Sequence, residues 1–177
     1  DVSQITIYDP PWGFGQPADL KSADIVFVTV PTPQLATGEC DTSIVEEVVA
    51  MAEPRQAIVC HSTVAIGTTD RLIKTYNKPL VYVPEFAGES PDHPYRSMEN
   101  RRFMLLGGYQ PAISMVKAFI ERVYRQGCRF YEVQPAVAEV VKYMENAFLG
   151  LKVGFCNEFW ELCQAVGVNY EEVRELW

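Results

Sequence analysis

The feature that most constrains the fold is one long helical stretch near the C-terminal end, from Pro135 to Val166. Pro135 suits the first position of a helix, where its missing N–H would have no intrahelical partner. No further proline follows it, and Gly167 stands where a C-cap glycine belongs. At 1.5 Å per residue such a helix would be about 48 Å long, far longer than the helices of most globular domains.

Apolar residues recur on every side of this predicted helix: Val137, Val140, Val141, Met144, Phe148, Leu151, Phe155, Phe159, Leu162 and Val166. A helix that is apolar all round is buried on most sides, under a domain or against a partner. Gly150 and Gly154 form a G-x-x-x-G pattern that lets another backbone approach closely, although helices also tolerate single glycines at a cost of about 1 kcal/mol each. We therefore predict a homodimer built on this helix.

The composition sets broad limits on function. With 177 residues and 48% hydrophobic residues, the chain can form one domain, or one and a small part, around a real core. Its formal net charge is −8 and it has no long basic run, which argues against nucleic acid as a partner. We find no signal peptide and no run that could span a bilayer. The five cysteines are an odd number without a C-x-x-C pair, so we expect reduced thiols, a cytoplasmic protein and no metal site.

Short apolar runs alternate with helical patterns before the long helix. The predicted strands are Gln4–Tyr8, Asp24–Val30, Gln56–Cys60, Pro79–Val83, Phe103–Leu106 and Arg129–Val133. The predicted helices are Asp41–Ala52 (with a capping box from Ser43 to Glu46), Gly67–Tyr76, Pro111–Gln126 and one that follows a cap at Asn169. This alternation predicts the α/β class, with a partial doubly wound, Rossmann-like, mostly parallel sheet that precedes the long helix.

Five small polar or acidic residues stand just after predicted strands: Asp9, Thr32, Ser62, Thr63 and Glu85. In doubly wound sheets the ligand binds beyond the carboxyl ends of the strands, so these residues would gather in one crevice. Each of them alone is explained as well by turn chemistry. On the long helix, Glu139, Lys142 and Asn146 share one face by their spacing, although an ordinary solvated stripe would have the same spacing.

Four motifs occur in order along the chain: VTVPTP (28–33), HSTVAIGTT (61–69), VPEF (83–86) and AEVVKYMENAFLGLKVGFCNE (138–158). Together they resemble the UDP-glucose/GDP-mannose dehydrogenase family, the NAD-dependent nucleotide-sugar 6-dehydrogenases, over nearly the whole chain from Ile5 onward. The resemblance implies oxidation of a sugar C6 alcohol to a carboxylate with reduction of two NAD, in polysaccharide biosynthesis. It also implies an enzyme cysteine that holds the aldehyde as a thiohemiacetal and then forms a thioester, which water cleaves.

The resemblance implies two domains, an NAD-binding Rossmann-like domain over residues 1–133 and a helical dimerisation and substrate domain that begins at residue 134. Asp9 would bind the adenosine ribose hydroxyls, as an acidic residue after a strand does in dinucleotide folds. The other residues expected at the cofactor are Val30, Pro31, Thr32, Ser62, Thr63 and Glu89.

The same resemblance assigns catalytic and substrate-binding roles. Thr63 would position a catalytic water, and Glu85 would be the acid or base for hydrolysis. Lys142 and Asn146 would stabilise the developing oxyanion and hold the sugar. Glu85 and Glu89 would also lie at the substrate, and no metal is implied.

The chain also departs from the family pattern. No G-x-G-x-x-G precedes Asp9, so the first βα unit is not represented, and the nucleophile motif Gly-Gly-x-Cys-x-Pro-Lys-Asp does not occur among these residues. Cys128 is no substitute, because neither a base nor a helix N-terminus stands beside it. Gly88 occupies an arginine position, and Ser90–Arg102 does not match the family's sugar-side loop. We expect a fragment or a compact form, of the kind that viral members would represent, that alone binds NAD weakly and does not turn over UDP-glucose.

Two alternatives stay open. A β-hydroxyacid dehydrogenase also carries K-x-x-x-N and would use Lys142 as a proton donor without a cysteine, although the PTP and PEF motifs argue against it. A non-catalytic, dimerising NAD-binding remnant would need neither the glycine loop nor the cysteine. The flanking coding sequence would distinguish them, and the sequence does not name the nucleotide sugar.

Overall fold

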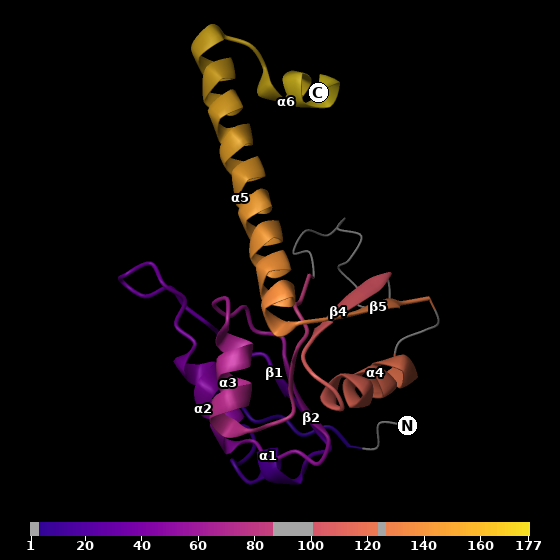
Figure 1. Cartoon of the computed structure of the whole chain (residues 1–177). Coiled ribbons are helices and arrows are strands. Elements are labelled where there is room, and N and C mark those ends of the chain that lie inside the picture. Colours follow the sequence, from indigo (N-terminus) through magenta and orange to yellow (C-terminus); the bar gives the residue numbers. More distant parts are fainter. Residues whose placement is uncertain (1–3, 87–100, 124–126) are drawn as a thin grey trace. The chain divides into compact units, whose positions relative to one another are not determined.

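The computed structural model describes residues 4–86, 101–123 and 127–177. The chain forms two compact units, Asp1–Lys142 and Tyr143–Trp177. Helix α5, which runs from Pro135 to Val166, begins in the first unit and ends in the second. Figure 1 shows the helices and strands of both units.

The first unit contains a five-stranded sheet. Its strands, in sheet order as in chain order, are β1 (Ile25–Val28), β2 (Ala57–Cys60), β3 (Leu80–Tyr82), β4 (Phe103–Gly107) and β5 (Arg129–Val133). All neighbours are parallel except β3 and β4, which pair antiparallel at Tyr82 and Gly107. The predicted α/β class with a mostly parallel sheet is confirmed.

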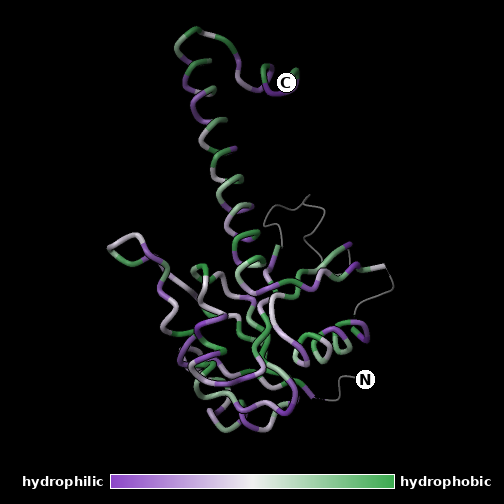
Figure 2. Tube along the Cα trace, viewed as in Figure 1, coloured by the Kyte–Doolittle hydropathy of each residue, from purple (hydrophilic) through white to green (hydrophobic). Residues whose placement is uncertain are grey.

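Helices cover both faces of this sheet. The helices of the first unit are η1 (Pro10–Trp12), α1 (Asp19–Ser22), α2 (Ser43–Met51), α3 (Thr68–Tyr76), α4 (Ala112–Val123) and the first turns of α5. Successive side chains of β2 point to opposite faces: Ile58 packs with the core under α2 and α3, and Val59 with the core under α4. The central strands β2 and β3 are therefore buried on both faces, whereas β5 at the edge of the sheet is largely exposed, and Figure 2 shows hydrophobic segments at the centre of the unit.

Two local predictions are wrong. Residues 4–8 form no strand, and Ile5 and Ile7 are exposed; the chain instead turns back, so that Asp9 N–H donates to the Phe14 carbonyl. An alternating apolar pattern makes a strand only where a neighbouring strand pairs with its backbone. The capping box is also wrong, because Glu46 reaches Arg71 and Tyr76 instead, and Asp41 Oδ1 accepts from Ser43 N–H at 2.9 Å.

Both predicted helix ends near the C-terminus are confirmed. Gly167 adopts a left-handed conformation with φ 73°, and the Val168 N–H donates to the Cys163 carbonyl at 3.0 Å. This is a Schellman motif, which satisfies carbonyls at the end of α5. Asn169 Oδ1 accepts from the Glu171 N–H at 3.0 Å and caps α6 (Tyr170–Leu176).

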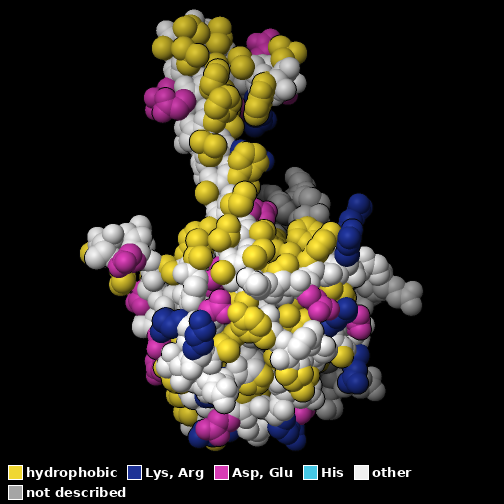
Figure 3. All heavy atoms as spheres, in the orientation of Figure 1, with side chains coloured by type: hydrophobic (Ala, Val, Ile, Leu, Met, Phe, Trp, Pro, Cys, Tyr) yellow, Lys and Arg dark blue, Asp and Glu magenta, His cyan; other side chains and the backbone are white. Residues whose placement is uncertain are grey.

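The second unit exposes most of its apolar side chains. They include Met144, Phe148, Leu151, Val153, Phe159 and Val166 on α5, and Figure 3 shows hydrophobic side chains along this helix.

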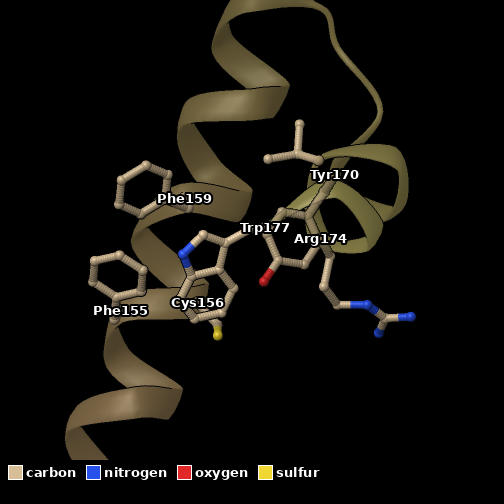
Figure 4. Close-up of a pocket in the computed structure, with 7 residues that line it drawn as sticks. Phe155, Cys156, Phe159, Tyr170, Arg174 and Trp177 are labelled. Atoms are coloured by element: carbon tan, nitrogen blue, oxygen red, sulfur yellow. The ribbon is translucent and has the colours of Figure 1, made fainter.

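Seven side chains surround a cavity of about 170 Å³: Phe155, Cys156, Phe159, Tyr170, Val173, Arg174 and Trp177 (Figure 4). Within the described part of the chain, no helix is long and apolar enough to cross a bilayer.

Candidate active site

The carboxyl ends of β1, β2 and β3 lie side by side at one edge of the sheet. Val28 pairs with Cys60, and Cys60 pairs with Tyr82, in a continuous parallel register. The loops that leave these three strands carry most of the predicted site residues. This edge is the position at which a doubly wound sheet binds its ligand.

Two hydroxyl groups join the first two of these loops. Thr32 Oγ1 donates to the Thr63 carbonyl at 2.7 Å, and Ser62 Oγ donates to the Val30 carbonyl at 2.7 Å. Each hydroxyl has only one proton, and here that proton is committed to the neighbouring loop. The oxygens of Thr32 and Ser62 therefore present lone pairs, which can accept a hydrogen bond from a bound ligand.

His61 joins the ends of β2 and β3. Its Nδ1 lies 2.6 Å from the Val83 carbonyl, so the ring donates an N–H there, and it stacks on Phe27 with 5.7 Å between ring centroids. Burial lowers the pKa of His61, and the nearby charge of Arg101 lowers it further against the opposing effect of the Val83 hydrogen bond. The imidazole is thus held neutral as a structural link, a role that the sequence motif at residues 61–69 did not indicate.

Lys142 and Glu85 come together at the end of β3. Lys142 Nζ donates to the Glu85 carbonyl at 2.5 Å and lies 5.1 Å from the centre of the Phe86 ring. The amine is partly buried, so the interpretation of Lys142 as part of a solvated stripe is wrong. Helix α5 therefore places the ammonium group of Lys142 next to the VPEF motif.

The Glu85 carboxylate forms an ion pair with Arg101, whose side chain is only 4% exposed. Sequence reasoning did not single out Arg101, which lies near the end of the Ser90–Arg102 segment that does not match the family pattern. Two adjacent arginines, Arg101 and Arg102, precede β4, and nothing in the sequence distinguishes the first of them as a site residue. The structure adds Arg101 to the charged groups of the candidate site.

Glu139 is fully buried on the first turns of α5. Its carboxylate accepts hydrogen bonds from the Gly67 N–H at 2.6 Å, the Thr69 N–H at 2.8 Å and Thr69 Oγ1 at 2.6 Å. The spacing of Glu139, Lys142 and Asn146 predicted a shared face, but not that the first of them would be buried against α3.

The structure does not bring every predicted residue to this edge. Asp9 lies in the N-terminal segment, where its backbone pairs with Phe14. Pro31 does lie at this edge, in the loop after β1 between Val30 and Thr32, and is exposed. Asn146 is an exposed residue of the second unit. Glu89 lies outside the described residues. Their predicted roles stay predictions.

Two of the five cysteines have raised pKa values that make them poor nucleophiles. All five thiols are free of disulfide bonds. Burial raises the pKa of Cys60 to about 12 and also raises the pKa of Cys128. A thiol with a raised pKa is a poor nucleophile at neutral pH, which supports the prediction that Cys128 does not act as one.

NAD is the cofactor expected at this edge, because doubly wound sheets bind dinucleotides there. The lone pairs of Thr32 and Ser62 can accept from the hydroxyl and amide donors of a dinucleotide, and the edge lies beyond the carboxyl ends of parallel strands. The residues present thus fit this group. Among the described residues, no cluster of three His, Cys, Asp or Glu side chains could hold a metal ion.

Comparisons with known proteins agree with NAD as the cofactor. Residues 15–127 match the NAD-binding domain of the UDP-glucose/GDP-mannose dehydrogenase family, and residues 136–177 match its central domain. The chain is 31% identical over 179 residues to the UDP-glucose 6-dehydrogenase of Rhizobium meliloti, covering 88% of this chain and 39% of that protein. It is 27% identical to the Rickettsia typhi protein of the same name, over 89% of this chain and 38% of that one.

Solved structures give the same result. A UDP-glucose dehydrogenase from Pyrobaculum islandicum matches with a TM-score of 0.69 and 27% identity, over 86% of this chain and 38% of that one. The GDP-mannose dehydrogenase of Pseudomonas aeruginosa shares the fold, with a TM-score of 0.71 and 24% identity over 86% of this chain and 38% of that one. The chain thus spans under two fifths of the length of each of these relatives. The resemblance inferred from the four sequence motifs is confirmed, and the chain belongs to the UDP-glucose/GDP-mannose dehydrogenase family.

Proposed function

We propose that the protein containing these residues oxidises the C6 alcohol of a nucleotide sugar, such as UDP-glucose, to the uronic acid with NAD. The observation that carries the proposal is the contact between Lys142 Nζ and the Glu85 carbonyl, at 2.5 Å. It brings two residues of separate family motifs to the edge where a dinucleotide would bind.

Lys142 is suited to stabilise negative charge on the substrate oxygen. An ammonium group carries three N–H donors, so it can bind a backbone carbonyl and a substrate oxygen at the same time. The hydrogen bond to the Glu85 carbonyl fixes the ammonium group, and the Phe86 ring beside it excludes water from one side. A fixed, partly desolvated cation stabilises an oxyanion more strongly than a mobile lysine in water would.

Glu85 is suited to move protons between the substrate and water. Its carboxylate is about one third exposed, so water can reach it, while Arg101 holds it in one place. Thr63 is fixed through its carbonyl by Thr32 and could orient such a water. The bound NAD would supply hydride acceptance, and Val30, Thr32 and Ser62 would line it. Asp9, Pro31, Glu89 and Asn146 keep the roles that the family resemblance implies.

The test is an NADH absorbance assay on the natural full-length protein with a panel of nucleotide sugars. We expect Lys142→Ala to lower kcat by roughly 10²- to 10³-fold with a much smaller change in KM, because an oxyanion donor acts in the transition state. Cys128→Ser is the matched control and should keep the wild-type rate. Turnover of a β-hydroxyacid instead of a nucleotide sugar, or no turnover at all, would refute the proposal in favour of one of the two alternatives.

We further propose a cytoplasmic homodimer whose product serves polysaccharide synthesis. The free thiols are consistent with a reducing compartment. The dimer would form through α5, because a Cβ atom added at Gly150 or Gly154 would meet no atom of the described residues within 4 Å, and exposed apolar side chains surround both glycines. An exposed apolar surface of this kind is typical of a protein interface.

A further inference from the structure

Glu139 is a buried carboxylate to which the proposed reaction gives no role. Its three hydrogen-bond donors all belong to the first turn of α3, at Gly67 and Thr69. Helix α3 has no side-chain cap of its own, because its N-cap residue is Gly67. Glu139 therefore supplies from another helix the acceptor that a Ser, Thr or Asp would supply locally.

This carboxylate connects the two predicted catalytic segments. Gly67 lies four residues after Thr63, and Glu139 lies three residues before Lys142. Three residues of helix correspond to a rise of about 4.5 Å, which is less than one turn. A shift of the Glu139 carboxylate against α3 would therefore move Lys142 relative to the loop that carries Thr63.

The same turn of α5 is also held against the sheet. A Cβ atom added at Gly107 would lie 2.7 Å from Ala138 Cβ and 3.2 Å from Pro135 Cα, so β4 and α5 are in close contact there. That packing fixes the distance of the helix from the sheet. The hydrogen bonds of Glu139 are directional, and they fix its rotation and its height along α3.

We propose that Glu139 is a positioning residue that sets the placement of Lys142 relative to Thr63. The inference rests on the proposed function for its effect on turnover, but the linkage itself is a property of the fold. Glu139 does not need to touch the substrate. It acts through Lys142, and this separates it from a residue that only stabilises the fold.

Glu139→Gln tests the role with little change in shape. The amide keeps one acceptor oxygen but places an NH₂ group against donors, so at least one of the three hydrogen bonds is lost. In the natural full-length protein we expect kcat to fall roughly 10- to 100-fold, as misplacement of a catalytic group by about 1 Å does. KM for the nucleotide sugar should change far less than kcat.

The decisive comparison repeats Glu139→Gln in a Lys142→Ala background. If Glu139 acts through Lys142, most of its effect on kcat should disappear there. An equal fold loss in both backgrounds would overturn the proposal and leave Glu139 a structural residue. Thr69→Ser and Thr69→Val form a milder pair: the serine keeps the hydroxyl donor and should keep kcat, whereas the valine should lower it. These variants carry the test if Glu139→Gln does not fold.

Hydrogen exchange separates failure of this inference from failure of the proposed function. Glu139→Gln should speed amide exchange in residues 61–69 and around Lys142, and leave α4 unchanged. Unchanged exchange at residues 61–69 would overturn the linkage even in an active enzyme. If the natural full-length protein has no nucleotide-sugar activity but Glu139→Gln still speeds exchange at residues 61–69, the proposed function is refuted and the linkage stands.

Discussion

Gly107→Ala gives a direct measure of how tightly α5 is docked on the sheet. Gly107 ends strand β4 and is buried, and a Cβ atom there would meet Ala138 Cβ at 2.7 Å. Carbon atoms normally pack at about 3.5–4.0 Å, so the helix or the strand has to move by about 1 Å. Neither neighbour is a flexible side chain that could turn away. We expect a loss of about 1–3 kcal/mol in stability, which is the usual cost of overpacking a core.

A second substitution isolates the cause. Ala138→Gly removes the atom that the new methyl group would strike, and by itself it costs about 1 kcal/mol in helix propensity. The double variant Gly107→Ala/Ala138→Gly should therefore be more stable than the sum of the two single losses. The remaining close contact, 3.2 Å from Pro135 Cα, limits how complete the recovery can be.

The assay is thermal unfolding of the four proteins followed by circular dichroism, with kcat measured in parallel. For a domain of this size each kcal/mol corresponds to about 2–4 °C in Tm. The single variant should also lose turnover, because α5 carries Lys142. If the losses in the free energy of unfolding of the two single variants add up to that of the double variant within about 0.5 kcal/mol, the close contact is not the reason for glycine at this position.

Two further predictions concern pH and assembly. Burial lowers the folded-state pKa of His61 below the unfolded value of about 6.5, so the unfolded chain takes up the proton first and stability should fall as pH drops below about 6.5 towards the folded pKa. His61→Asn keeps an N–H donor for Val83 without a titrating ring and should flatten the dependence of Tm on pH between about 7.5 and 5.5; equal slopes would contradict the assignment. Gly150→Ala should stabilise an isolated helix by about 1 kcal/mol but weaken the proposed dimer, so sedimentation at several concentrations should show easier dissociation. An unchanged dimerisation constant would show that the interface does not use this glycine.

The sequence was enough to predict helix ends and apolar strands, because neighbouring residues determine them. Pro135 and Gly167 mark the two ends of α5, since proline is favoured at the first turn of a helix and glycine directly after its last residue. The apolar runs of β2 and β3 were recognisable because strands buried on both faces read as continuous hydrophobic segments, and β1 has the same apolar composition although its Phe27 is exposed. The position of the candidate site could then be predicted, because ligands bind beyond the carboxyl ends of parallel strands.

The rest depends on contacts between distant residues, which local patterns do not encode. Glu139 meets Thr69 across seventy positions of the chain, and Glu85 meets Arg101, which lies in a segment that does not match the family pattern. The apolar alternation of residues 4–8 looked like a strand because pattern rules test the side chains and not the presence of a pairing partner. Glu46 resembled a cap residue for the same reason, and Arg71 and Tyr76 compete for it successfully.

The hydrogen bonds of Glu139 also decide which helix end can receive a phosphate. The N-terminus of a helix carries a partial positive charge of about half a unit, which normally attracts anions. At α3 a carboxylate of the protein already occupies that position, with its oxygens on the Gly67 and Thr69 N–H groups. An anionic ligand at α3 would have to displace a fully buried internal anion. Helix α3 is therefore closed to the pyrophosphate of a dinucleotide, and its neighbouring loop is left to parts of the ligand that carry no phosphate.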